Sequence, residues 1–165
     1  MMAMYSQIDF ALQAIDEGFN RTAWHGTNLR GSIRRVKAIQ AAWRLETGRH
    51  NIWEITVHTA YWKYAVRRRI LGEKRGSFAL AGSDWFERPE NLTEDAWKAD
   101  VVLLEEEHRK MRDAVSSLRD ASLEAVSGKG KTTLGALVRG IAAHDVYHAG
   151  QIQLLKRLYS SWQGE

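Results

Sequence analysis

The sequence contains no cysteine among its 165 residues, and this absence excludes several classes of protein. Disulfide scaffolds, cysteine zinc fingers, iron–sulfur clusters and enzymes with a thiol nucleophile all need cysteine. Any bound metal must therefore be held by carboxylates or by the 6 histidines. Proline occurs once, at Pro89. A chain of this length buries roughly two-thirds of its unfolded surface, so it needs neither a disulfide nor a metal in order to fold.

The sequence also lacks a long hydrophobic run and a strong excess of charge. Its longest aliphatic run is Val101–Leu104, far short of the ~20 residues that a membrane span needs. Residues 1–5 lack the pattern of a signal peptide, so we expect a cytoplasmic protein. Lys and Arg number 24 and Asp and Glu 20, a mild excess of +4. We interpret the basic clusters at 34–37 and 67–69 as solvated helix faces and expect no nucleic-acid and no membrane partner.

Four stretches repeat apolar residues at the spacings of 3 and 4 that line one face of a helix. We expect helices over about 4–20, 51–72, 93–118 and 132–159. Asn51 and Thr93 suit helix starts, and Gly72 suits a helix end. No stretch alternates as a strand does. Such helices can bury their apolar faces only against one another, which predicts an all-α, single-domain four-helix bundle over residues 1–165.

The links between the expected helices differ in length. Residues 21–50 form a long first crossover, with a short helix expected around 33–43. Residues 73–92 form a second long link. Residues 128–133 contain two glycines and only superficially resemble a phosphate-binding loop, because their spacing is wrong and no strand precedes them. We interpret that segment as a flexible turn.

The clearest chemical signal is the pair His144 and His148. Residues at i and i+4 lie on the same helix face, so both imidazoles can reach one metal ion. Both fall on the apolar face of their helix, and His58 lies on the apolar face of the second helix. Three protein ligands with one open position are typical of a catalytic zinc site. The alternative is that each histidine is a core residue with its hydrogen bonds satisfied within the protein.

The sequence leaves the roles of three further polar residues undecided. His108 could be a fourth metal ligand, a substrate contact or a core residue. Of these, the core residue is the preferred interpretation. Asp145 gives an H-D-x-x-H pattern similar to the H-E-x-x-H of zinc proteases, but aspartate is one methylene shorter than glutamate. Asp145 either orients a ligand or faces water. Gln151 could hydrogen-bond a metal ligand or a substrate.

The aromatic residues at helical spacing are expected to fill the core. This holds for Trp53, Trp62 and Trp97. Tyr61 and Trp62 lie close to His58 in the sequence. Their alternative role is to line a substrate pocket beside it. No catalytic side chain is assigned.

Nearly the whole chain resembles the DinB-like family of bacterial four-helix-bundle proteins, which includes YfiT-like metal-dependent hydrolases. The most specific segment is His144–Ile152, together with His58. Weaker similarities lie at 23–26, 50–62, 84–86 and Trp97.

The resemblance implies that His58, His144 and His148 bind a divalent metal, commonly zinc or nickel. It also implies an up-up-down-down-like bundle with a long first crossover, and a homodimer. Characterised relatives include transferases that use low-molecular-weight thiols, so the leading hypothesis is a thiol S-transferase acting on a small-molecule substrate. One alternative is a hydrolase with a metal-bound hydroxide, and another is a noncatalytic metal- or ligand-binding stress protein.

Overall fold

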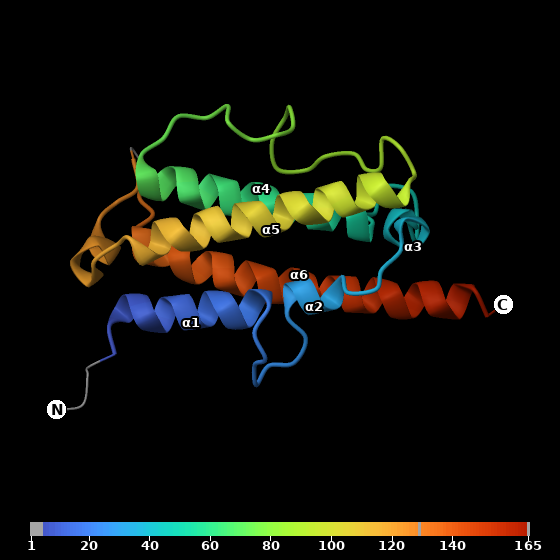
Figure 1. The fold of residues 1–165 in the computed structure, drawn as a ribbon, viewed down its shortest axis with the longest axis horizontal. Coiled ribbons are helices and arrows are strands. Elements are labelled where there is room, and N and C mark those ends of the chain that lie inside the picture. Colours follow the sequence, from blue (N-terminus) through green and yellow to red (C-terminus); the bar gives the residue numbers. More distant parts are fainter. Residues whose placement is uncertain (1–4, 129, 165) are drawn as a thin grey trace.

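The computed structural model describes residues 5–128 and 130–164, and within them four long helices form a bundle (Figure 1). The first link carries two short helices, and a 3-10 turn precedes the last long helix. The described part of the chain contains no strand, only an isolated bridge between Val126 and Thr133. The elements are α1 (Gln7–Phe19), α2 (Leu29–Ser32), α3 (Ala38–Ala42), α4 (Ile52–Leu71), α5 (Glu94–Ser116), η1 (Asp120–Glu124) and α6 (Leu134–Trp162).

The directions of the four long helices explain the two long links. Helices α1 and α6 run one way along the bundle, and α4 and α5 run the other way (Figure 1). The order is therefore up-down-down-up, which differs from the up-up-down-down order that the resemblance implies. Because α4 and α5 are parallel neighbours, residues 73–93 must return along the length of the bundle. This return segment and the α1–α2 loop lie on opposite edges of the molecule.

Caps place the helix ends close to where the sequence predicts them. Asn51 accepts a hydrogen bond from Glu54 N while the Glu54 side chain accepts from Asn51 N, a complete capping box at the start of α4. Gly72 ends α4 with a φ of 69°, a conformation that favours glycine. Ser6 caps α1, and the predicted start at Met4 lies outside the described residues. The third helix ends at Ser116, two residues before Leu118.

Within the range 33–43, where one short helix is predicted, the structure has only α3, and a second short helix, α2, precedes this range. The break falls at Arg35, whose φ of 64° is left-handed and cannot continue a right-handed helix. The predicted turn at 128–133 includes residue 129, which lies outside the described residues. On either side of it, Ser127 N donates to Thr132 O over 2.9 Å, which closes the turn.

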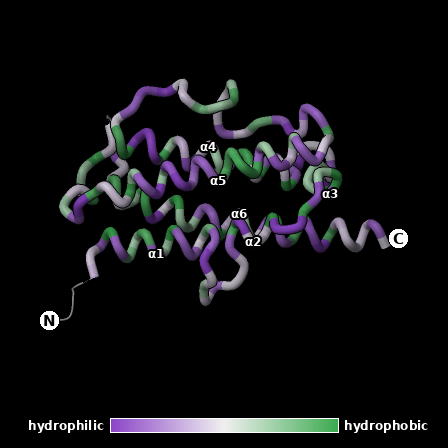
Figure 2. Tube along the Cα trace, viewed as in Figure 1, coloured by the Kyte–Doolittle hydropathy of each residue, from purple (hydrophilic) through white to green (hydrophobic). Residues whose placement is uncertain are grey.

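The buried apolar side chains form two adjoining clusters. One lies where α4 packs against α5 and the first link, and the other lies where α1 and α6 pack against the ends of α4 and α5. Hydropathy alternates along each long helix, as expected when one face is buried (Figure 2). Helix α4 is buried on nearly all sides over its first four turns. None of the helices in the described part of the chain is long and apolar enough to cross a membrane.

Candidate metal centre

The structure brings together the three histidines that the sequence singles out. His58 comes from α4, and His144 and His148 lie one turn apart on α6. His144 Nε2 is 3.2 Å from His58 Nε2 and 3.1 Å from His148 Nε2. One ligand atom from each residue lies within 4.8 Å of the others, close enough for a single ion. We call these three residues the histidine cluster.

Hydrogen bonds on the far side of two rings turn the Nε2 lone pairs toward the centre. His58 Nδ1 lies 2.9 Å from the backbone carbonyl oxygen of Asp84, so it carries the proton and donates it. His148 Nδ1 donates to Gln151 Oε1 over 2.7 Å. Both rings therefore present an unprotonated Nε2 to the cluster, as metal binding requires. His144 Nδ1 has no hydrogen-bond partner among the described residues.

Burial keeps the cluster uncharged. It lowers the pKa of His144 to about 3, aided by the neighbouring His148, and that of His148 to about 4. Burial also lowers the pKa of His58, although Asp84 opposes the shift. A desolvated imidazole is costly to protonate, so all three rings are neutral at physiological pH. Neutral imidazole is the form that binds a metal ion.

Asp84 and Trp85 in the return segment complete the surroundings of the cluster. Trp85 stacks on His58 with ring centroids 3.8 Å apart and on His50 at 3.5 Å, so it is sandwiched between two imidazoles. Asp84 Oδ1 accepts from Trp62 Nε1 over 2.8 Å and lies 3.2 Å from His58 Nδ1. Sequence reasoning noted residues 84–86 only as part of a resemblance. It could not predict their contact with His58, because a loop carries no periodicity that places it.

Lys63 and Asp145 form a buried ion pair beside the cluster. Lys63 Nζ lies 2.5 Å from Asp145 Oδ2, and the two side chains are 0% and 1% exposed. Asp145 therefore neither faces water nor contacts a histidine ring, the two roles that the sequence suggested. No role was predicted for Lys63 from the sequence. Its spacing from Thr56 and Thr59 nevertheless places it on a second buried stripe of α4.

His108 lies outside the histidine cluster, which excludes it as a fourth ligand in this arrangement. Its ring stacks on Phe19 with centroids 3.6 Å apart, and it is 5% exposed. Burial and the charge of Lys63 lower its pKa to about 2. His108 Nδ1 finds no hydrogen-bond partner within the part of the chain described.

The aromatic residues divide between the core and the site. Trp53 and Trp97 are buried and meet edge to face with centroids 5.2 Å apart, as predicted for core residues. Tyr61 is buried among aromatic neighbours. Trp62 is half-buried and flanks the cluster, with its ring 6.3 Å from His144. Of the two candidates for a pocket wall, Trp62 is therefore the one that contacts the site.

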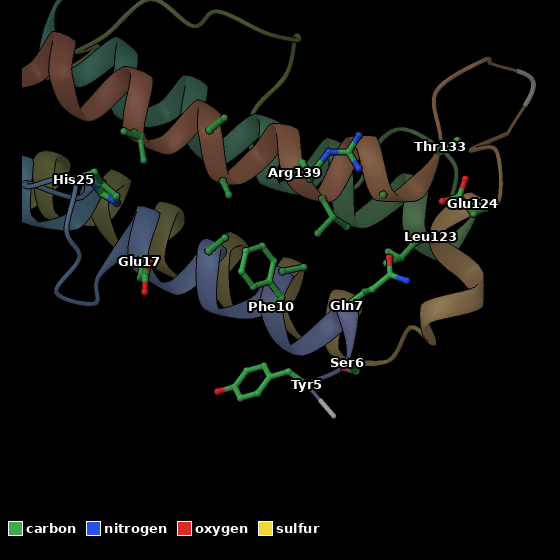
Figure 3. A pocket seen from close by; sticks show the side chains of 17 residues that line it. Tyr5, Ser6, Gln7, Phe10, Glu17, His25, Leu123, Glu124, Thr133 and Arg139 are labelled. Atoms are coloured by element: carbon green, nitrogen blue, oxygen red, sulfur yellow. The ribbon is translucent and has the colours of Figure 1, made fainter. Parts of the chain in front are cut away.

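An apolar groove of about 640 Å³ runs between α1 and α6. Phe10 of α1 and Arg139 of α6 border it (Figure 3). Ala142 and Val146 line the groove and lie two residues on either side of His144. Two residues correspond to about 200° around a helix, so the groove faces away from the histidine cluster.

A family model described as the DinB superfamily matches residues 21–152. The match covers 132 of the 165 residues and includes all members of the histidine cluster. No curated protein and no solved structure shows a significant match to the chain.

Proposed function

This chain belongs to the DinB superfamily, and we propose that it is a metal-dependent enzyme whose divalent ion is held by His58, His144 and His148. The observation that carries the proposal is the convergence of three uncharged, largely buried imidazoles through their Nε2 atoms. Without an ion, three lone pairs directed at one point repel each other unless one nitrogen is protonated. A shared metal ion removes that repulsion.

The donor set fits zinc or nickel. Imidazole suits both metals, and three imidazoles leave a further coordination position for a substrate. The hydrogen bonds to Asp84 and Gln151 fix the tautomers of two ligands, as hydrogen-bond partners of the ligands do in established metal sites. Carboxylates are absent from the cluster among the described residues, which disfavours the oxygen-rich coordination of calcium and magnesium.

We propose that the reaction is the transfer of a low-molecular-weight thiol to an electrophilic small molecule. The chain has no cysteine, so a sulfur nucleophile must be supplied by a ligand. A bound divalent ion favours the thiolate, the nucleophilic form of a thiol. Trp62 and Trp85 provide an apolar wall at the cluster. Tyr147 is 64% exposed, and its hydroxyl accepts from Gln151 Nε2 over 3.2 Å, so it can hydrogen-bond a substrate at the edge of the site.

Hydrolysis is the less favoured reaction because it needs a base that takes a proton from water. The nearest carboxylate contact is that of Asp84, and it is made to His58 Nδ1, the ring nitrogen turned away from the cluster. Asp145 is occupied by Lys63. These contacts leave neither carboxylate placed for that role.

The test is a pair of assays on metal-loaded protein. Conjugation of an electrophile such as monochlorobimane is measured with and without bacillithiol, mycothiol or glutathione, and ester cleavage is measured without thiol. We expect conjugation that needs both a thiol and the metal and is lost in His144→Ala. Thiol-independent ester cleavage that is lost with the metal would favour the hydrolase. Absence of turnover in both assays, with the metal still bound, would favour a binding protein.

A further inference from the structure

A basic groove lies on a different side of α6 from the histidine cluster. It has a volume of about 1010 Å³ and is formed by the α1–α2 loop, α2 and the end of α6. Its charged lining residues are Arg30, Arg34, Arg35 and Lys156, and no carboxylate lines it. Around α6, Lys156 is turned by about 100° and Gln153 by about 160° from the midpoint of His144 and His148. The groove is therefore separate from the proposed metal centre.

The fold leaves most of these cations uncompensated. Arg30 pairs with Glu105, but Arg34 and Arg35 form no ion pair with any described residue. Lys156 Nζ donates to the carbonyl oxygen of Ser32 over 2.9 Å. Burial and the nearby charge of Arg34 lower the pKa of Lys156. The groove thus concentrates positive charge at a cost in repulsion that a bound anion would relieve.

A second cavity of about 500 Å³ adjoins the groove and shares Asn20 and Arg30 with it. His108 lines this second cavity, and it is the buried imidazole whose Nδ1 lacks a partner. A neutral imidazole can hydrogen-bond an uncharged polar group of a ligand. The carboxylates of Asp16 and Glu105 also line the second cavity, where they pair with Arg112 and Arg30. The buried polar atom that remains without a partner among the described residues there is His108 Nδ1.

An exposed tryptophan belongs to the loop that lines the groove. Trp24 is 100% exposed, whereas its loop neighbours Ala23 and Gly26 line the groove. A tryptophan ring that is wholly exposed to water contributes no packing to the fold. A flat aromatic face beside a phosphate-binding groove is the arrangement on which nucleobases stack.

We propose that this groove binds a small phosphorylated ligand of the nucleoside polyphosphate class. Arg34, Arg35 and Lys156 hold the phosphates through charge-assisted hydrogen bonds. The base stacks on Trp24, and polar groups of the ligand reach toward His108. The volume matches that of small-molecule pockets, and a single exposed aromatic residue suits one base rather than a strand.

The test is calorimetric titration with ATP and with inorganic triphosphate, in EDTA and at low salt. The groove variant is Arg34→Gln with Arg35→Asn, because asparagine tolerates the left-handed φ at position 35. The matched control is Lys74→Gln with Arg75→Asn, an exposed pair in the return segment that loses the same charge. His144→Ala is included because phosphates can also bind at a metal centre.

We expect ATP to bind the wild type, the Lys74/Arg75 control and His144→Ala alike, and about tenfold or more weaker to the groove variant. Trp24→Ala should weaken ATP binding but leave inorganic triphosphate unchanged. Equal ATP binding by the groove variant and the control would overturn the proposal, as would failure of wild type to bind ATP. Binding of a 12-residue single-stranded oligonucleotide far more tightly than ATP, lost in the groove variant, would assign the groove to nucleic acid instead.

Discussion

Asp84 contacts His58 through two of its oxygen atoms. The backbone carbonyl oxygen lies 2.9 Å from His58 Nδ1, and the carboxylate Oδ1 lies 3.2 Å from the same nitrogen. The carboxylate also accepts from Trp62 Nε1, so a single loop residue connects the return segment to α4 at two points. Asp84 has a φ of 67°, an uncommon conformation for a residue other than glycine that aspartate and asparagine tolerate best.

Asp84→Ala should weaken metal binding by roughly 10- to 100-fold, the usual cost of losing an outer-shell partner. The alanine disfavours the left-handed φ and removes the carboxylate, so the contact of the loop with His58 is weakened in both ways. Asp84→Asn should lose less metal affinity, because asparagine tolerates the same φ and the backbone carbonyl contact with His58 is kept. Competition with a chromophoric chelator measures both affinities. Equal affinity of the wild type and Asp84→Ala would show that this contact does not support the cluster.

Lys63→Met should destabilise the protein by about 3–5 kcal/mol, because it leaves the Asp145 carboxylate buried without its partner. Combining it with Asp145→Leu, which has the same branching as aspartate, should recover most of the loss. Urea unfolding of the two single variants and the double variant gives the coupling energy.

The exposed pair Arg109 and Asp113 is the control for that experiment. Its atoms lie 3.6 Å apart, with both side chains about two-thirds exposed, so Arg109→Met should cost no more than about 1 kcal/mol. A loss from Lys63→Met as small as this would mean that water reaches the Lys63 site and that the pair is not buried in solution.

His108 should make the protein less stable in acid. Its folded pKa of about 2 lies below the unfolded value of about 6.5, so between these values the unfolded state binds a proton that the folded state does not. The contribution of His108 to stability is therefore unchanged above pH 6.5 and falls by about 1.4 kcal/mol per pH unit below it. His108→Leu should remove about 3 kcal/mol of the loss between pH 7 and pH 4.

Urea unfolding of metal-free protein across this pH range measures that slope, with His25→Leu on the exposed α1–α2 loop as the control. An unchanged slope in His108→Leu would show that His108 is protonated in the folded protein.

Metal binding should persist to a lower pH than the sequence alone suggests. An ordinary histidine pKa of about 6.5 predicts weakening that begins above pH 6. Burial lowers the pKa of all three ligands, to about 3 for His144 and about 4 for His148, so protons should begin to compete with the metal only below pH 6. Affinity measured from pH 7 to pH 4 should therefore stay level to below pH 6 and then fall. A decline that begins above pH 6 would indicate that the cluster is more exposed to water than the structure shows.

Local rules were sufficient to predict the helices and the convergence of the histidines. The 3- and 4-residue spacing located four helices, and Asn51 and Gly72 marked two of their ends. Helix geometry alone placed His144 and His148 on one face. His58 could be added because it lies on an apolar face that must be buried in a bundle.

The features that the sequence did not predict depend on contacts between distant segments. Trp85 reaches His58 from a loop with no regular pattern. Lys63 and Asp145 stand 82 positions apart, and each charge is tolerated in the core only because the other is there. The up-down-down-up arrangement depends on the direction in which each helix runs through the bundle. Helix periodicity carries no information about that direction.

The most direct test of the central claim is metal content measured on purified wild-type protein and on His58→Ala, His144→Ala and His148→Ala. Each protein is dialysed against zinc or nickel and then against metal-free buffer, and His25→Ala serves as the control for general histidine binding. The account predicts about one ion per chain in the wild type and the control, and almost none in the three cluster variants. Full retention of the ion in the cluster variants would contradict it.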